Sequence, residues 1–192
     1  MSDMERELRR LKDIEAIVRL RSLYCYYADL KDCDNWANLF TEDGVFETDV
    51  FGIHRGRETI RALQHLPFAV HYVANPIIDV DGDRATGRWL LFEPCSFPVG
   101  KRNQPVWGMA KYEDVYERVG GEWKFKHVKL MSHTWSPFEK GWEKERIIGQ
   151  KAAARKKAAA RPMPKAKANA TAKAKAKTKA KATARKKAAR RV

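Results

Sequence analysis

The run His71–Asp83, HYVANPIIDVDGD, constrains the fold of this chain more than any other stretch. It is rich in strand-forming residues, and a DG dipeptide between strand-like segments is a strong signal for a tight hairpin turn. Side chains alternate along a strand, so His71, Val73 and Asn75 are predicted to share one face. If that face borders a cavity, it offers an imidazole and a carboxamide to a ligand.

The charge of the chain is segregated between two parts. Of 192 residues, 39 are Lys or Arg and 24 are Asp or Glu, and every acidic residue lies within residues 1–150, together with 22 basic ones. That segment has a formal charge of −2 (22 − 24), whereas residues 151–192 hold the other 17 basic residues and no acidic one. The net charge of +15 is therefore no guide to the partners of the first segment.

Residues 1–150 contain all the aromatic residues and cysteines and are predicted to form one domain, which can bury about 70% of its unfolded surface. Three cysteines without CxxC spacing argue against a disulfide framework or a zinc site and favour a reducing, cytoplasmic location. The N-terminus is too charged for a signal peptide, and no apolar run reaches the roughly 20 residues of a membrane helix. We expect no metal and no nucleotide cofactor, because neither pattern occurs.

The segment 151–192 alternates Lys with Ala, contains Arg clusters and has no aromatic residue, so we predict that it is disordered in isolation. It resembles the tails of linker histones and of some bacterial nucleoid proteins. Such tails displace counterions from phosphate, which gives tight, sequence-independent binding to nucleic acid. The alternative is a solubilising extension without a specific partner. No apolar face accompanies the charge, so a membrane partner is not expected.

Apolar residues at spacings of three and four predict a long helix over residues 4–30. A second, short helix is expected over residues 33–40, with Thr41–Gly44 as its C-terminal stop. A third helix is expected over residues 56–66, and a short closing helix within residues 138–149.

The remainder of the domain is predicted to be sheet. Besides the central run, strands are expected over residues 45–51, 85–92, 106–119 and 123–135. Residues 93–104 contain two prolines and a glycine and are expected to form a loop. The order ααβαββββ ends in an antiparallel meander, and helices on one side of such a sheet define an α+β fold.

Over residues 5–140 the chain resembles the SnoaL-like branch of the nuclear-transport-factor-2-like superfamily. The segments that carry the resemblance are YCYYADLKD, TEDGVFET, HRGRETI, HYVANPIIDVDGDRATGRW and GMAKYEDVYERVGGEWKFKHVKL. The subgroup that it resembles most contains scytalone dehydratase, the bile-acid 7α-dehydratases and hexachlorocyclohexane dehydrochlorinase. The resemblance implies a cone-shaped α+β barrel, in which a strongly curved, mostly antiparallel sheet packs on three helices around an internal pocket. It also implies a homotrimer.

The resemblance further implies a catalytic His-Asp dyad. His71, four residues before the Asn-Pro pair, matches the histidine, and Asp29, near the end of the first helix, matches the aspartate. Tyr24 matches a tyrosine of the dehydratases, where the dehydrochlorinases have a lysine, which favours loss of water over loss of halide. In such chemistry His71 is the general base, Asp29 orients its ring, and Tyr24 donates a hydrogen bond to a carbonyl or departing hydroxyl.

Periodicity alone supports a different interpretation of these residues. Asp29 lies about 120° round the helix from Leu23 and about 140° from Tyr24, which predicts a solvent-facing side chain. A lone histidine on a strand is more often a packed or surface residue than a base, and Tyr24 by itself is more often core. Only the resemblance brings Asp29 and His71 together.

Four further residues are candidates for binding the substrate: Asn75, Trp89, Trp107 and His127. Asn75 belongs to the predicted face of His71. The two tryptophans suit a flat apolar ring system, but aromatic residues are equally common in an ordinary core. His127 shares strand parity with two aromatic residues, so it is either a second acid or base in the pocket or, as we favour, a hydrogen-bonded core residue.

Together these patterns predict a cytoplasmic, cofactor-independent lyase. Its reaction would be β-elimination, foremost dehydration, of a hydrophobic, hydroxylated cyclic or steroid-like small molecule. The alternatives are a non-catalytic small-molecule-binding domain tethered to nucleic acid by its basic tail, and an isomerase of the same fold.

Overall fold

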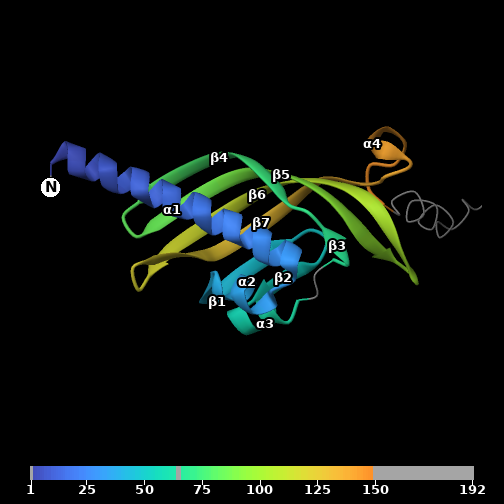
Figure 1. Cartoon of the computed structure of the whole chain (residues 1–192), viewed down its shortest axis with the longest axis horizontal. Helices are drawn as coiled ribbons and strands as arrows, with labels where there is room; N and C mark the ends of the chain where they lie inside the picture. Colours follow the sequence, from blue (N-terminus) through green and yellow to red (C-terminus); the bar gives the residue numbers. More distant parts are fainter. Residues whose placement is uncertain (1, 64–65, 149–192) are drawn as a thin grey trace, which may run out of the picture. The chain divides into compact units, whose positions relative to one another are not determined.

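The computed structural model describes residues 2–63 and 66–148 (Figure 1). In these residues the first three helices lie on one side of a curved sheet, as the predicted α+β cone requires, and the short last helix lies at the other end. The predicted tail, residues 151–192, lies outside the described residues. The elements are, in order, α1 (Asp3–Leu30), α2 (Cys33–Asn38), β1 (Phe40–Thr48), β2 (Gly52–Arg55), α3 (Arg57–Arg61), β3 (Phe68–Ala69), β4 (Tyr72–Asp81), β5 (Arg84–Val99), β6 (Arg102–Val119), β7 (Glu122–Pro137) and α4 (Gly141–Lys144).

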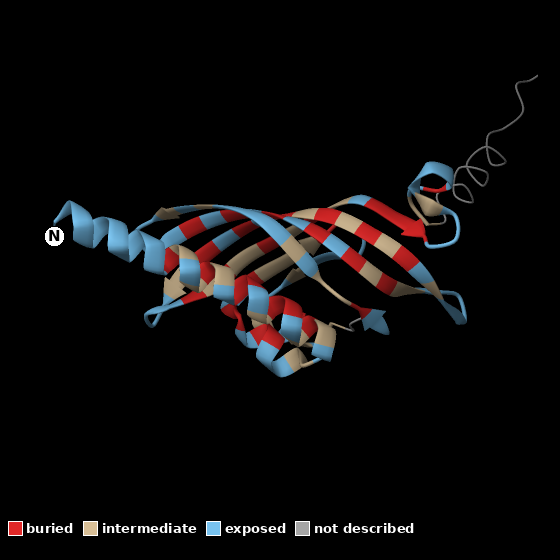
Figure 2. Ribbon diagram, turned by 45° about the horizontal axis from the view of Figure 1, so that its top comes forward, coloured by how far each residue is buried: buried red, intermediate tan, exposed pale blue. Residues whose placement is uncertain are grey.

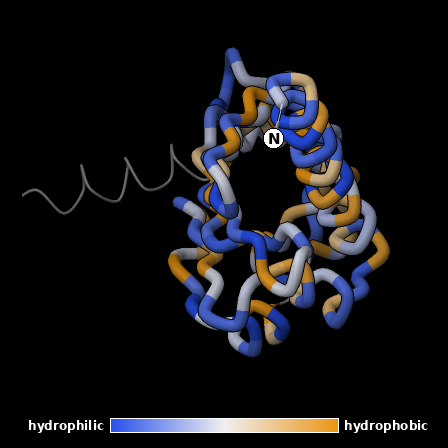
Figure 3. Tube along the Cα trace, turned by 90° about the vertical axis from the view of Figure 1, so that its left-hand side faces the viewer, coloured by the Kyte–Doolittle hydropathy of each residue, from blue (hydrophilic) through white to orange (hydrophobic). Residues whose placement is uncertain are grey.

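The long helix α1 has well-defined ends. Ser2 and Glu5 form a capping box at its start, which satisfies backbone N–H groups that have no partner inside the helix. Lys31, in the left-handed conformation with φ 61°, ends it. Its first three turns are exposed, whereas its second half packs on the sheet and α2 through a buried stripe (Figure 3 shows hydrophobic positions recurring along the helix). The predicted helix 4–30 is thus confirmed.

The sheet formed by the described residues has seven strands in the order β2-β1-β7-β6-β5-β3, and β4 also pairs with β5. Only β1 and β7 are parallel among these pairs, so the predicted, mostly antiparallel arrangement is confirmed. The DG hairpin is also present, since Asp81 pairs with Arg84 across Gly82, whose φ is 59°. Buried and exposed positions alternate along β5 and β6 (Figure 2), and the buried ones form the core under α1.

The predicted loop over residues 93–104 is wrong. β5 continues to Val99 and β6 begins at Arg102, so the two strands form one long hairpin. Proline is tolerated in a strand where its missing N–H is not needed for the ladder. Pro94 lies inside β5, and its carbonyl accepts from the Val70 N–H at 3.2 Å, so its nitrogen faces the same edge, away from β6; Pro98 lies near the end of the strand. The alternation of buried side chains through Cys95 outweighs the proline signal.

Two predicted boundaries near the helices are also wrong. Thr41–Gly44 does not end a helix but forms a bulge in β1, because the Leu39 carbonyl accepts a hydrogen bond from the Phe125 N–H at 2.9 Å and draws the chain into the sheet. Helix α3 ends at Arg61 instead of residue 66. Ala62 is its C-cap, and Pro67 disfavours a helical conformation only at Leu66, the last residue of the predicted helix.

Candidate functional site

A cavity of about 100 Å³ lies between the helices and the sheet. Most of its wall is apolar and comes from α1, α2, several strands of the sheet and the connections between elements. The apolar residues are Ala28, Trp36, Phe46, Phe51, Leu63, Leu66, Ala69, Leu130 and Trp135. The polar residues are Tyr24, Thr48, His71, Glu93 and Tyr112. An apolar pocket with a few convergent polar groups is the usual form of a small-molecule site.

His71 and Asp29 are in direct contact at the cavity wall. The Nδ1 atom of His71 is 2.6 Å from Oδ1 of Asp29, and the backbone N–H of His71 donates to Oδ2 at 3.1 Å. Because an ionised carboxylate only accepts hydrogen bonds, this contact places the ring proton on Nδ1. The lone pair of the neutral ring is then on Nε2.

The prediction of a solvent-facing Asp29, drawn from helical periodicity, is wrong. Its side chain is 24% exposed, because the connection that precedes β4 passes beside the last turn of α1 and brings His71 to it. Helical periodicity describes only the face of α1 that packs on the core. It carries no information about a strand that crosses the edge of that face.

A second carboxylate, Glu93 of β5, lies on the other side of the His71 ring. Its Oε1 atom is 3.6 Å from Nε2, and its side chain is 6% exposed. Burial raises the pKa of Glu93. Burial by itself lowers the pKa of His71, but the negative charges of Glu93 and Asp29 outweigh it and raise that pKa above its ordinary value. The two facing groups thus form an imidazole–carboxyl pair that holds a proton.

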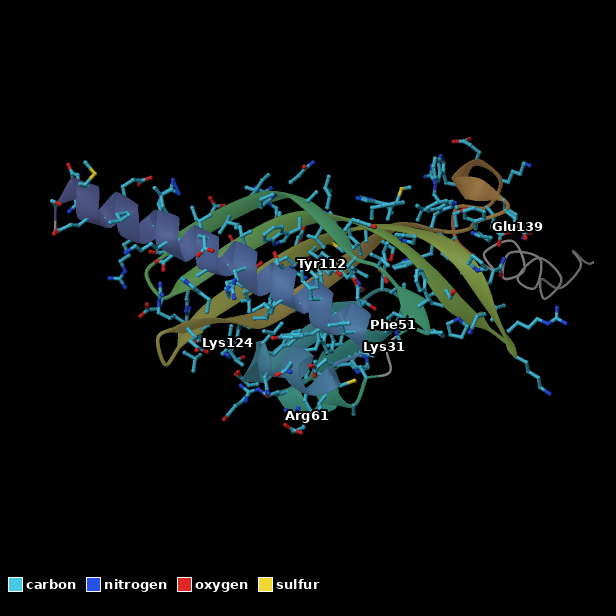
Figure 4. All side chains as sticks on the ribbon, viewed as in Figure 1. Lys31, Phe51, Arg61, Tyr112, Lys124 and Glu139 are labelled. Atoms are coloured by element: carbon cyan, nitrogen blue, oxygen red, sulfur yellow. The ribbon has the colours of Figure 1, made fainter. Side chains whose placement is uncertain are left out.

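Two tyrosines complete the polar part of the wall. Tyr24 of α1 and Tyr112 of β6 are buried, with their ring centroids 6.1 Å apart, and Tyr24 meets the His71 ring edge-on at 6.3 Å. Figure 4 shows Tyr112 where α1 crosses the sheet. Burial raises the pKa of both phenols, so they are hydrogen-bond donors over the physiological pH range.

None of the four predicted substrate-binding residues is among the described residues that line this cavity. Asn75 is exposed, because it sits with φ 55° in a bulge of β4 that breaks the alternation expected from His71. Trp89 is buried in the core, where its Nε1 donates to the Tyr116 hydroxyl at 3.0 Å. It borders a second groove, between α1 and β4, which Asp29 and His71 also line.

The other two candidates lie away from the cavity as well. Trp107 stacks with Phe92 on the opposite face of the sheet, at a centroid distance of 5.6 Å. His127 does not lie on the buried face with Trp123 and Phe125, because Lys126 is an extra residue in a bulge of β7 opposite β6. Its ring is one-third exposed, and Nε2 lies 3.0 Å from Oε2 of Glu47.

Glu93 is the main polar residue of the site that sequence reasoning missed. It was hidden by the loop predicted from the prolines that follow it. A signal was present nevertheless, since the period-two series of buried residues on β5 continues through position 93. A carboxylate within such a series is unusual, because buried charges are rare unless they are paired.

The described residues show no group of three or more His, Cys, Asp or Glu side chains that could hold a metal ion. No helix in this part of the chain is long and apolar enough to cross a membrane.

A curved sheet packed on helices around an apolar cavity is the architecture of the nuclear-transport-factor-2-like class. The model of the SnoaL-like domain matches residues 9–129, and the chain belongs to this family.

Proteins similar to this chain include enzymes and proteins without an assigned role. Hexachlorocyclohexane dehydrochlorinase LinA-type3 from Novosphingobium barchaimii is 22% identical, with a TM-score of 0.61 over 69% of this chain and 94% of that one. A putative scytalone dehydratase from Novosphingobium aromaticivorans is 23% identical, with a TM-score of 0.58 over 67% and 89% of the two chains. Uncharacterized protein Rv2910c of Mycobacterium tuberculosis is 25% identical over 130 residues, 63% of this chain and 88% of its own length.

Proposed function

We propose that this protein is a cofactor-independent lyase that removes water from a hydroxylated cyclic small molecule by β-elimination. The observation that supports this most is the imidazole of His71, held between the carboxyl groups of Asp29 and Glu93 at the wall of an apolar cavity. An acid and a base positioned side by side, with pKa values that their surroundings raise, suit such a reaction. The dehydratase and dehydrochlorinase among the similar structures agree with this class of reaction.

In the proposed reaction His71 is the base. Its Nε2 takes a proton from the carbon next to a carbonyl, and the C–H electron pair forms the new double bond as the C–O bond at the β carbon breaks. In the reacting state the proton that the pair shares lies on the Glu93 carboxyl, which gives it to the departing hydroxyl, and this leaves as water. Asp29 holds the ring and stabilises the imidazolium. The tyrosine hydroxyls donate to the carbonyl oxygen.

The separation of His71 and Glu93 also allows the cycle to close. After elimination His71 carries an extra proton and Glu93 lacks one. The two groups are 3.6 Å apart, so a small movement returns the proton and restores both groups. The same pair can return the proton to a different carbon of the substrate, which is the isomerase alternative.

The size of the cavity favours a small substrate. A volume of about 100 Å³ is below the roughly 300–1,000 Å³ of sites for drug-sized ligands. We therefore propose a monocyclic compound in preference to a steroid nucleus, which would require α1 or the residues near Leu66 to move outward.

The test is a screen of cyclic β-hydroxy ketones with the full-length protein, in which water loss is followed by the ultraviolet absorbance of the conjugated product. His71→Ala is expected to reduce turnover by about 10²–10⁴-fold, the usual contribution of a general base. His127→Ala is the matched control, because His127 also pairs with a carboxylate but outside the cavity. Full turnover by His71→Ala would contradict the assignment, and a rearranged product instead of a dehydrated one would identify an isomerase.

Three further proposals extend this function. A cytoplasmic location follows from the cysteine pattern, and contact of residues 151–192 with nucleic acid follows from their charge. An interface between copies of the chain, which the family resemblance implies to be that of a homotrimer, fits the exposed aromatic residues on the outer face of the sheet, where Tyr72 stacks on Phe92.

A further inference from the structure

An ion pair is fully buried behind the two tyrosines of the cavity. The guanidinium of Arg21 in α1 pairs with the carboxylate of Asp114 in β6, and neither side chain is more than 2% exposed. Asp114 also accepts a hydrogen bond from the Tyr116 hydroxyl at 2.7 Å. Replacing a buried ion pair with well-packed apolar residues is often neutral or stabilising, so stability alone does not account for this one.

The positive charge of Arg21 is directed at aromatic rings. Its Cζ atom lies 4.6 Å from the ring centroid of Tyr24, 4.2 Å from that of Tyr112 and 4.7 Å from that of Phe125. In the part of the chain that the structure describes, Nε and Nη1 of Arg21 have no hydrogen-bond acceptor. The guanidinium is therefore surrounded mainly by aromatic rings, with which it makes cation–π contacts.

We propose that Arg21 is a positioning residue that polarises the phenol groups of Tyr24 and Tyr112 toward a substrate oxygen that gains negative charge. A cation on the face of the ring stabilises the electron-rich phenolate more than the phenol, so the hydroxyl becomes a stronger hydrogen-bond donor. Asp114 fixes the guanidinium at the rings, and Tyr116 in turn fixes Asp114.

This inference rests on the proposed function and makes the substrate class more specific. Elimination next to a carbonyl places negative charge on the carbonyl oxygen, and two polarised phenols are suited to receive that charge. A carbonyl oxygen must then reach Tyr24 and Tyr112 while the neighbouring C–H faces His71. The substrate class is a ring ketone with its hydroxyl group β to the carbonyl.

The electrostatics of the phenols agree with this arrangement. Burial raises the pKa of Tyr24 and of Tyr112, and the charge of Arg21 opposes that rise in both. The other neighbouring groups that raise the pKa of one or both phenols are Cys25, Glu93 and Asp114. The phenols also act on each other, since the charge of Tyr24 raises the pKa of Tyr112 and a hydrogen bond with Tyr112 lowers that of Tyr24. Arg21 is thus the one cation among these groups, and it keeps the donor strength of buried phenols from falling further.

The test measures the ionisation of residue 24 directly in the full-length protein. 3,5-Difluorotyrosine, which ionises closer to neutral pH than tyrosine, is incorporated at position 24 and titrated by fluorine NMR. In Arg21→Met/Asp114→Leu both charges are replaced by apolar groups, and we expect the pKa of the labelled phenol to rise by about 1 unit or more. Asp114→Asn leaves the cation without its counter-charge, so the pKa should fall.

Arg118 provides a matched control. It pairs with Asp13 at 2.7 Å and lies 4.3 Å from the ring centroid of Trp123, but it has no contact with the cavity. The variant Arg118→Met/Asp13→Leu should leave the pKa of the labelled phenol unchanged.

Two results would overturn the proposal: an unchanged pKa in Arg21→Met/Asp114→Leu, or shifts of the same sign in this variant and in Asp114→Asn. If the double variant does not fold, Asp114→Asn alone decides, because an unchanged or raised pKa contradicts the polarising role. The fluorine titration needs no turnover. Absence of lyase activity would therefore contradict the proposed function, whereas the effect of Arg21 on the phenol would still be decided by the titration.

Discussion

The contact between His71 and Glu93 makes a quantitative prediction about the histidine. At a separation of 3.6 Å, the Glu93 charge is the largest influence that raises the pKa of His71. An opposite charge within about 4–6 Å changes a pKa by about 1–3 units, and a solvent-poor site favours the upper part of that range. We therefore expect Glu93→Gln, which keeps the shape and removes the charge, to lower the pKa of His71 by about 1–3 units.

The assay is a pH titration of the histidine rings by ¹H–¹⁵N NMR. The chain has 5 histidines, and the His71 signal is assigned from its loss in His71→Gln. Glu47→Gln is the control, because Glu47 faces the one-third-exposed ring of His127 and solvent screens that pair. The reasoning is refuted if the pKa of His71 stays the same or rises in Glu93→Gln, or if the control moves it as far.

The same pair links the stability of the fold to pH. Both groups have a raised pKa in the folded state, so the folded protein binds more protons than the unfolded chain between the ordinary and the raised values. Their contribution to the free energy of unfolding is present below these ordinary values, 4.5 for Glu93 and 6.5 for His71, and is lost as pH rises through the raised values. Urea unfolding at several pH values should show this decline in the wild type and a smaller one in Glu93→Gln.

Other perturbations test separate parts of the structure. Asp29→Asn should reduce turnover by about 10²–10⁴-fold with little change in substrate affinity, measured as kcat and KM, because the ring of His71 loses its orienting carboxylate. Tyr116→Phe leaves the buried indole N–H of Trp89 without a partner and removes one hydrogen bond from the Asp114 carboxylate, which keeps its pair with Arg21. It should cost about 1–3 kcal/mol in urea unfolding. Gly108→Ala would bring a methyl group within 2.4 Å of the Trp135 ring, so we expect a loss of about 1–3 kcal/mol by the same measurement.

The periodic parts of the fold could be predicted from the sequence. The long helix, the DG hairpin and the final meander each follow from a repeat or turn signal that acts over a few residues. The β5–β6 hairpin was missed because proline was weighted above alternation. A proline whose nitrogen faces away from the partner strand, as in Pro94, removes no bond of that ladder, whereas the buried series on β5 continues to Cys95.

The site was harder to predict because single-residue irregularities decide which side chains reach it. One bulge turns Asn75 outward, and another, at Lys126, removes His127 from the buried face. A period-two pattern of apolar residues in the sequence does not predict either bulge. The contact of Asp29 with His71 joins residues 42 positions apart, and no local rule predicts it. The family resemblance supplied the pairing, and the register of β5 supplied Glu93.

The ladder around β5 has a mechanical consequence for the site. Ala69 pairs with Cys95 and Tyr72 pairs with Phe92. His71 and Glu93 therefore lie on backbone that the same strand pairing holds together, and the register of that pairing sets their spacing. Asp29 belongs to a different layer, the helix. A motion that moves α1 away from the sheet would break the contact between Asp29 and the His71 ring and allow the ring to rotate. The backbone positions of His71 and Glu93 would keep their spacing. Proton exchange between His71 and Glu93 therefore depends on the sheet, whereas the orientation of the His71 ring depends on α1, so a substitution can change one without the other.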